Sequence, residues 1–381
     1  MSLAFRSPVT GAQLVPHGPH LLRDADGRLW PIVDGIPFLR VGRDDLVKEC
    51  ADRLAAEDCR GALALLLTDQ DDWWTGAKPE AADLTRLVRD RDRVSLRDAM
   101  DLLGFDRVGH YFAHRWSDPT FLAGLALLEA HWRPAEAAFE LACGIGHYGR
   151  ELARRGVRFT GADVVFSKLW LARHWVLPPE ATLICFDAAA PWPLTGQHFD
   201  LAFCHDAFYF LEPKADILAA LRELAGPDGR VTLSHIHNAA ADNLSAGRAM
   251  TATAMAHHFP RATLYDDAEL THALVDARAP RAAPIEALGH VEAFSVEDGA
   301  SGPARTVAEG LAVPPSSAAL RLNPLYQPDG GGLGVAWPTP RYAAEYGGRA
   351  TYPVRLPSTA PDARDAEAIR RRIFVDLPER W

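Results

Sequence analysis

Short apolar runs alternate with amphipathic segments through the middle of the chain. The apolar runs cover residues 137–142, 159–164, 181–186, 200–204 and 230–236. Helical patterns at 150–155, 168–175 and 215–225 lie between them. Short apolar runs bounded by turns are typical of buried strands, and apolar positions three or four residues apart indicate helices. This alternation predicts an α/β fold in which helices cover both faces of a doubly wound, mostly parallel sheet.

The residues before this region follow other patterns. Residues 28–39 place β-branched and aromatic residues around an Asp-Gly turn, which predicts a hairpin in a small β unit over 1–43. Residues 44–132 have apolar positions at helical spacing. We expect a helical lead-in there, part of which would serve as a lid.

The core is expected over 133–298, with an insertion at 238–265 that would form walls of an acceptor pocket. Beyond it, residues 299–381 are rich in Pro and Gly. We therefore expect an irregular C-terminal extension with little regular structure. Its segment 337–347 carries enough aromatic surface to cap a pocket or to form the contact of a homodimer.

Composition narrows the classes of protein. Of the 381 residues 48% are hydrophobic, which excludes disorder of the whole chain, and the net charge of -10 speaks against a nucleic-acid partner. The sequence has no apolar run long enough for a membrane span, and its start lacks the pattern of a signal peptide. The cysteines show no paired spacing, which favours a reducing cytoplasm: Cys50, Cys59, Cys143, Cys185 and Cys204.

A glycine-rich turn occupies residues 140–149, E-L-A-C-G-I-G-H-Y-G. It follows a predicted strand and opens a helix, and the spacing of its glycines allows close approach of the backbone to a ligand. Asp163 ends the next strand, where its carboxylate would accept both hydroxyls of a ribose. Taken alone, these features fit a nicotinamide dinucleotide as well as S-adenosylmethionine (SAM).

Three further features separate the two cofactors. Glu140 ends the first strand, where a carboxylate suits a ligand with an ammonium group. Asp187 follows the third strand and could accept from an adenine amino group, although a helix N-cap is a rival role for it. A fourth strand begins at 199, and a G-P-D-G turn at 226–229 precedes the fifth.

Together, these pieces make the segment from Glu140 to Leu233 resemble the class I SAM-dependent methyltransferases. The motifs that carry the resemblance are E-x-x-x-G-x-G, the acidic end of the second strand, the Asp187-Ala188 pair, the F-D strand and the P-x-G turn. It covers less than half of the chain. It implies a Rossmann-like doubly wound sheet, SAM as cofactor and S-adenosylhomocysteine as product.

The resemblance also implies roles for individual residues. Glu140 would hold the methionine ammonium, and Asp163 the ribose hydroxyls, with Val164 packed on the adenine. Asp187 and Ala188 would contact the adenine edge. Backbone around the glycines would line the methionine and the ribose: Ala142, Cys143, Gly144 and Gly146. Three residues at the end of the fourth strand would lie near the methyl group: Cys204, His205 and Asp206.

Candidate catalytic groups follow the fourth and fifth strands. Ligands bind at the carboxyl ends of parallel strands, and histidine is well suited to take a proton near neutral pH. We expect His235 or His237 to be the general base, with His205 or Tyr209 orienting the acceptor. The rival role for these histidines is hydrogen bonding to loop backbone. The H-x-H pair with Asp206 could also hold a metal, but the acidic ligand pattern of metal-assisted methyltransferases is missing, so we expect none.

The segment 109–121 precedes the core and would cover the cofactor. Tyr111 and Arg115 are candidate lid residues, with His114 and Trp116 beside them, and Arg115 could meet the SAM carboxylate. Ordinary packing at a helix end is the alternative.

The first residues show a second resemblance. S-P-V-T-G-A-Q-L at 7–14 and the segment 30–39 resemble the small zinc-ribbon-like domain of methyltransferase activator proteins. Ser7 and Thr10 stand where that family has cysteines. We therefore expect a structural unit without zinc, although His17 and His20 could serve as substitute ligands.

The sequence thus predicts a cytoplasmic enzyme that methylates a small-molecule metabolite, in a biosynthetic role. A hydroxyl oxygen is the expected target, because histidines at strand ends suit removal of its proton. N- and C-methylation remain open. Two other readings remain: an NAD(P)-dependent oxidoreductase built on the same glycine turn, and a non-catalytic SAM-binding scaffold.

Overall fold

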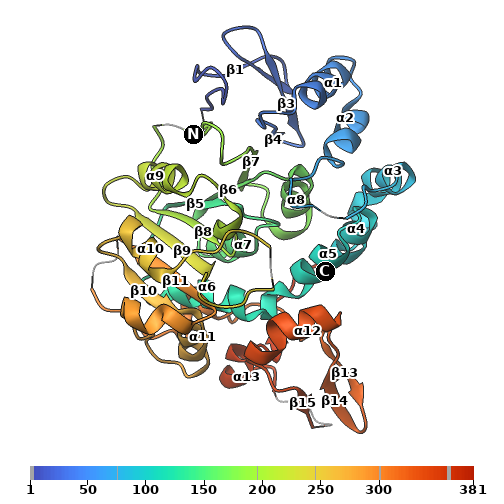
Figure 1. The fold of residues 1–381 in the computed structure, drawn as a ribbon. Helices are drawn as coiled ribbons and strands as arrows, with labels where there is room; N and C mark the ends of the chain where they lie inside the picture. Colours follow the sequence, from blue (N-terminus) through green and yellow to red (C-terminus); the bar gives the residue numbers. More distant parts are fainter. Residues whose placement is uncertain (1–3, 75, 195, 245, 300–301, 358–361) are drawn as a thin grey trace.

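A seven-stranded sheet forms the centre of the protein, in the order β10-β11-β9-β8-β5-β6-β7 (Figure 1). The computed structural model describes residues 4–74, 76–194, 196–244, 246–299, 302–357 and 362–381. The strands are β5 (Ala137–Leu141), β6 (Arg158–Asp163), β7 (Thr182–Cys185), β8 (Leu201–His205), β9 (Arg230–His237), β10 (Thr263–Asp266) and β11 (Ala293–Asp298). The five strands from β9 to β7 pair in parallel, and β11 is antiparallel to both neighbours. The predicted doubly wound, mostly parallel sheet is confirmed.

Helices pack against this sheet: α6 (Pro119–Ala130), α7 (His147–Arg154), α8 (Phe166–Leu171), α9 (Lys214–Ala225) and α11 (Asp267–Val275). Helix α10 (Ala252–His258) contacts the 3-10 turn at Ile285–His290. Helix α6 is apolar on all sides and contacts β9, β11 and α11, which explains why nearly every one of its residues is buried. The side chain of Asp118 accepts from the Thr120 amide and caps its first turn.

The N-terminal β unit has four strands: β1 (Val15–Pro16), β2 (Leu21–Arg23), β3 (Leu29–Val33) and β4 (Ile36–Pro37). Its β3–β4 hairpin turns at Asp34 and Gly35, both at positive φ. Ser7 and Thr10 stand where the activator proteins have cysteines. Ser7 Oγ accepts from the amide of Thr10, and the Thr10 hydroxyl donates to Asp24. Polar side chains therefore close this turn.

The lead-in consists of helices, as its spacing predicts: α1 (Asp44–Ala55), α2 (Cys59–Leu66), α3 (Ala81–Asp90), α4 (Leu96–Leu102) and α5 (Asp106–His114). The loop between α2 and α3 is fixed by a buried ion pair in which Arg40 Nη1 lies 2.5 Å from Asp69 Oδ2. Arg43 Nε contacts the other oxygen of the same carboxylate at 3.0 Å. The loop is thereby held against the end of the β unit.

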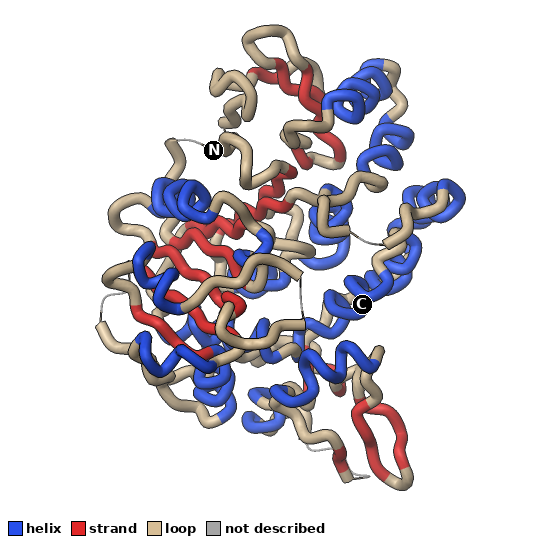
Figure 2. The backbone as a smooth tube through the Cα atoms, in the orientation of Figure 1, coloured by secondary structure: helices blue, strands red, loops and turns tan. Residues whose placement is uncertain are grey.

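The C-terminal residues are more regular than their composition suggests (Figure 2). They form β12 (Arg321–Leu322), β13 (Tyr326–Asp329), β14 (Gly332–Val335), β15 (Arg355–Leu356) and β16 (Phe374–Val375), with α12 (Pro340–Tyr346) and α13 (Ala366–Arg370). A separate small core that includes Tyr326, Tyr352 and Phe374 stabilises them. Most of the described residues of the extension still lie outside helices and strands, and strands of two to four residues leave almost no periodic signal in the sequence.

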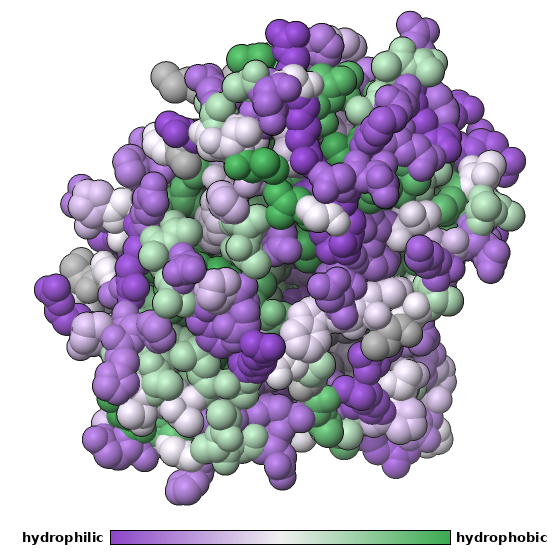
Figure 3. All heavy atoms as spheres, turned by 45° about the horizontal axis from the view of Figure 1, so that its top comes forward, coloured by the Kyte–Doolittle hydropathy of each residue, from purple (hydrophilic) through white to green (hydrophobic). Residues whose placement is uncertain are grey.

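The expected insertion at 238–265 runs into the sheet, since β10 begins at Thr263. None of the described helices is both long enough and apolar enough to cross a membrane. On the face seen in Figure 3, hydrophilic residues surround scattered hydrophobic ones. The boundaries of the four expected segments, the homodimer and the cytoplasmic location remain predictions.

Candidate cofactor and acceptor site

A cavity of about 510 Å³ lies at the carboxyl ends of the parallel strands. Its floor is formed by residues that end or follow β5, β6, β7 and β8, around the point where the strand order reverses. Ligands bind in such a crevice in open α/β sheets. Its other walls come from helix α5, from the loop at 71–74 and from helix α12.

The cavity brings together most of the residues that the sequence predicts for the site. These are Tyr111, Arg115, Glu140, Ala142, Cys143, Gly144, Asp163, Val164, Asp187, Ala188, His205 and Tyr209. Gly146, His235 and His237 do not line it. Gly146 opens helix α7 at a φ of 82°, and a Cβ there would lie 2.8 Å from Leu177, so this glycine serves the packing of the turn.

The glycine turn is held against the neighbouring strand. Gly144 has a φ of 57° and donates its N–H to Asp163 Oδ2 at 3.0 Å. The other oxygen of Asp163 accepts from the Val165 amide at 2.9 Å. A Cβ at Gly144 would lie 3.1 Å from the Phe112 ring, so the cavity wall leaves little room for a larger residue. The Asp163 carboxylate is thus fixed beside the turn.

Glu140 is a buried carboxyl on the cavity wall with an unsatisfied oxygen. Only 2% of the residue is exposed, and its Oε2 has no hydrogen-bond partner among the described residues. Burial raises the pKa of Glu140 well above its usual value, although Arg115 partly opposes this shift. A buried carboxyl without a partner favours a cationic ligand. The ammonium group of SAM has that chemistry, so the residue fits the expected cofactor.

Asp187 lies at the cavity but does not cap a helix, which was the rival role for it. Its Oδ1 accepts from the Ala189 amide at 2.9 Å, which closes a local turn rather than capping a helix. The residue is half-buried and lines the cavity together with Ala188. The carboxylate is therefore oriented by the backbone at the end of β7.

Asp206 links several walls of the cavity, a role that the sequence does not indicate. Its Oδ2 accepts from Tyr111 Oη at 2.8 Å and from Arg115 Nη1 at 2.6 Å, and Thr120 Oγ1 lies 3.1 Å away. Its Oδ1 accepts from Tyr209 Oη at 3.0 Å. Burial favours the neutral acid, but Arg115 and the other partners outweigh it and hold the pKa of Asp206 well below its usual range.

Arg115, expected to meet the SAM carboxylate, is already paired with Asp206. Its guanidinium is 5% exposed and lies 4.8 Å from the centre of the Tyr111 ring. In this arrangement Arg115 compensates a buried carboxylate and still reaches the cavity wall. Binding of the cofactor carboxylate by Arg115 remains a prediction.

The three candidate histidines have different surroundings. His205 lies on the cavity wall, its Nε2 lies 2.9 Å from Thr232 Oγ1, and burial lowers its pKa to about 3. His235 Nδ1 lies 2.7 Å from Asp267 Oδ2, behind the wall. The His237 ring is stacked on Tyr209 at 3.7 Å between ring centres, and burial lowers its pKa to about 4.

Further aromatic side chains, which are not among the candidate site residues, line the cavity. Tyr346 of helix α12 stacks on Tyr111, with 6.4 Å between ring centres. Trp73 and Phe210 both line the cavity, and their ring centres lie 5.3 Å apart. The aromatic content of 337–347 indicates a cap, which agrees with the position of α12. No sequence pattern marks Trp73, because it lies in a loop without periodicity.

The comparisons with known proteins cover part of the chain that forms this site. A family model described as a methyltransferase domain matches residues 138–229. The comparison with curated proteins gives no match.

Many solved structures are similar to parts of the chain. One is a Haloferax volcanii complex between a methyltransferase activator and a methyltransferase (17% identity, 44% of this chain, 75% of that chain, TM-score 0.35). Another is phosphoethanolamine N-methyltransferase 2 of Haemonchus contortus with SAM (18% identity, 45% of this chain, 46% of that chain, TM-score 0.36). A third is the Burkholderia thailandensis 1,6-didemethyltoxoflavin-N1-methyltransferase with S-adenosylhomocysteine (23% identity, 53% of this chain, 86% of that chain, TM-score 0.35).

This chain spans less than half of the length of the Haemonchus protein. The match over 138–229 covers the glycine turn, the acidic strand ends and the strands that form the cavity floor. Residues 138–229 therefore match a methyltransferase domain, and they lie within a Rossmann-like α/β fold.

Proposed function

We propose that the protein transfers the methyl group of SAM to a hydroxyl oxygen of a small-molecule metabolite. The observation that carries the proposal is one cavity lined both by carboxylates and by aromatic side chains. Glu140 and Asp163 suit the cofactor. Tyr209 and Tyr346 suit an acceptor, and we call the part of the cavity that they line the acceptor end. Because about 510 Å³ must hold both cofactor and acceptor, the space suits a small acceptor.

Methyl transfer requires few protein groups, because SAM itself carries the reactive methyl group. The acceptor oxygen forms a bond to the methyl carbon while the carbon–sulfur bond of SAM breaks and its electron pair stays on the sulfur of S-adenosylhomocysteine. The acceptor hydroxyl gives its proton to a base, for which His235 and His237 are the expected candidates. The site must align the two groups and exclude water. His205 and Tyr209 lie on the wall where they would orient the acceptor. Neither His235 nor His237 lines the cavity, and the Tyr209 ring is stacked on His237, so direct proton transfer to His237 would require movement of the Tyr209 side chain.

Thermal unfolding and product analysis test the proposal. We expect SAM and S-adenosylhomocysteine to raise the unfolding temperature and NADH to leave it unchanged. With a panel of phenols, aliphatic alcohols and amines, we expect S-adenosylhomocysteine and a methylated product to form only with the hydroxyl compounds. Stabilisation by NADH alone would contradict the methyl transfer, and methylation restricted to amines would contradict the oxygen target. A cofactor that binds but is never consumed with any acceptor would favour a scaffold.

Two single variants address the expected general base. If the His235→Ala and His237→Ala proteins retain wild-type turnover and still bind SAM, neither histidine takes the proton. Unchanged SAM binding serves as the internal control, because both side chains lie outside the cavity.

A further inference from the structure

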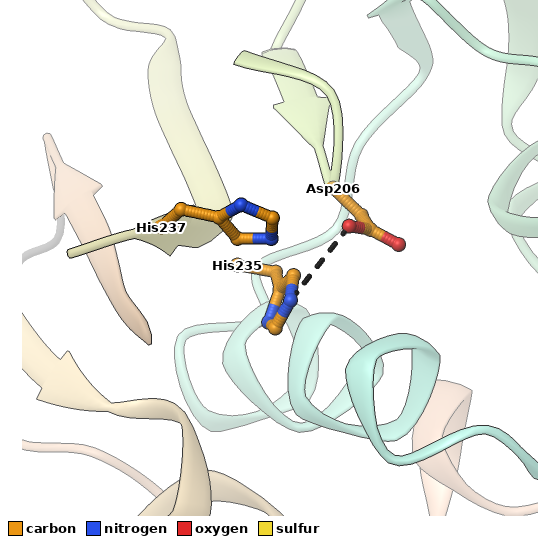
Figure 4. A group of neighbouring side chains, drawn as sticks. All are labelled: Asp206, His235 and His237. Carbon is orange, nitrogen blue, oxygen red and sulfur yellow. Dashed lines mark ion pairs between the residues drawn. The ribbon is translucent and has the colours of Figure 1, made fainter. Parts of the chain in front are cut away.

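Three side chains near the acceptor end of the cavity converge on one point (Figure 4). They are Asp206, which directly follows β8, and His235 and His237 at the end of β9. Each offers one ligand atom, and these three atoms lie within 4.8 Å of one another. All are protected from solvent: the Asp206 side chain is 5% exposed, and His235 and His237 are buried. We call these three residues the His-His-Asp cluster.

The polar atoms of the cluster are not satisfied by one another. His235 Nε2 lies 3.9 Å from Asp206 Oδ1, which is too far for a hydrogen bond. Among the described residues, the ring nitrogens of His237 make no hydrogen bond, although 94% of the residue is covered. The His237 ring nitrogens and His235 Nε2 are therefore available to a ligand, whereas both oxygens of Asp206 and His235 Nδ1 already have partners.

The size of the gap fits a metal ion. Zinc bonds of about 2.0–2.2 Å to nitrogen and oxygen place the ligands of a tetrahedral site about 3.4 Å apart. The observed 3.9 Å between His235 Nε2 and Asp206 Oδ1 would close by a few tenths of an ångström on binding. Two imidazoles and one carboxylate are a donor set that suits zinc and related divalent transition metals.

His235 also has the outer contact of a metal-bound histidine. Its Nδ1 lies 2.7 Å from Asp267 Oδ2, and the other oxygen of Asp267 accepts from Ser295 Oγ at 2.6 Å. A carboxylate at Nδ1 fixes the tautomer and leaves Nε2 free as a ligand, which is the usual arrangement around a metal-ligating histidine. The outer contact therefore aims Nε2 into the cluster.

The backbone brings the ligands together at some cost. His235 has a φ of 54° and Asp206 a φ of 52°, an unfavourable region for residues other than glycine. At His235, the pairing of β9 with β11 shifts between Phe294 and Val296. Irregularities of this kind re-aim side chains and are concentrated near functional sites. The two strained residues are the ones whose side chains face each other.

We propose that the His-His-Asp cluster binds one divalent transition-metal ion of the zinc type. The ion would lie behind Tyr209, whose hydroxyl donates to Asp206 Oδ1, and would hold that wall of the acceptor end in place. This goes beyond the proposed methyl transfer and gives His235 and His237 a role other than the general base. It differs from the sequence expectation of no metal, which named the same three residues as possible ligands but set them aside because the acidic ligand pattern of metal-assisted methyltransferases is missing.

Metal binding by the full-length chain tests the proposal directly. The protein is treated with a chelator, the chelator is removed, and Co²⁺ is added while visible absorption is recorded. We expect one tight site per chain with the absorption bands of nitrogen- and oxygen-bound Co²⁺. Zn²⁺ should compete for it.

In His237→Gln we expect the affinity to fall at least 10-fold. The matched control is His131→Gln, a buried histidine outside the cluster whose Nε2 lies 2.7 Å from Tyr265 Oη, and it should bind like the wild type. Equal affinity of the wild type and His237→Gln would overturn the proposal, as would absence of a tight site.

A second measurement uses only the wild-type chain, in case the variant does not fold. Nuclear magnetic resonance of histidine ring nitrogens during Zn²⁺ titration should show shifts of the His235 and His237 signals at one equivalent. Shifts confined to other histidines, such as His257 and His258 at the end of α10, would contradict the cluster as the site. Neither experiment includes an acceptor, so failure of the metal proposal leaves the methyl-transfer proposal intact.

Discussion

Replacing Glu140 by glutamine is expected to weaken SAM binding about 10- to 100-fold and at the same time to stabilise the ligand-free protein. The carboxyl is buried, and one of its oxygens has no partner among the described residues. In the ligand-free protein the charged form is therefore costly. When the ammonium of SAM arrives, the same charge becomes the favourable partner.

The pH dependence follows from the raised pKa of Glu140. A group whose pKa is higher in the folded than in the unfolded state contributes stability below the unfolded pKa. That stability is lost as pH rises through the folded pKa. The ligand-free wild type should therefore lose stability with rising pH relative to Glu140→Gln. SAM affinity should rise over the same interval in the wild type, because only the deprotonated carboxyl pairs with the ammonium.

Calorimetric titration with SAM between pH 5 and 9, together with urea unfolding, would measure both effects. The control is Glu136→Gln, which removes an exposed carboxyl four residues earlier and should change neither quantity. If Glu140→Gln binds SAM as tightly as the wild type at every pH, the assignment of Glu140 to the cofactor ammonium is wrong.

Removal of the Asp206 carboxylate is expected to have the largest effect on stability. In Asp206→Ala, the Arg115 guanidinium, 5% exposed, loses its ion-pair partner, and two tyrosine hydroxyls lose their acceptor. Leaving an uncompensated buried charge costs about 3–5 kcal/mol. The double variant Asp206→Ala/Arg115→Met should be less destabilised than the sum of the single variants, because it also removes the orphaned charge.

Urea unfolding in the presence of a chelator measures this coupling without any contribution from bound metal. Asp298→Asn is the control, since Asp298 pairs with Arg222 at 3.4 Å but remains partly exposed, and its loss should cost about 1 kcal/mol or less. Strict additivity of the Asp206 and Arg115 effects would show that the two side chains do not stabilise each other.

The sheet and most of the residues that line its crevice could be predicted because their signals are local. Each strand is a short apolar run, and the glycine turn, Asp163 and Asp187 directly follow such runs. The position of a residue at a strand end already fixes its place at the crevice in a parallel sheet. No long-range information is needed for these assignments.

The Asp206 network could not be predicted in this way. Tyr111 and Arg115 precede Asp206 by 95 and 91 residues, and no periodic pattern connects them. Strand alternation correctly suggests that His235 and His237 lie near each other, but not that His235 turns toward Asp267. That orientation depends on a local backbone irregularity, which a sequence pattern does not report.

The N-terminal β unit has a consequence for the solution behaviour of the protein. Strand β7 is at the edge of the central sheet, and the Leu39 amide donates to the Cys185 carbonyl at 2.7 Å, beside a bridge between Phe38 and Cys185. The unit thus occupies hydrogen-bonding groups that an open edge would offer to another chain. A protein shortened to its catalytic core would expose this edge and be prone to aggregate, so the small unit at the start of the chain also protects its solubility.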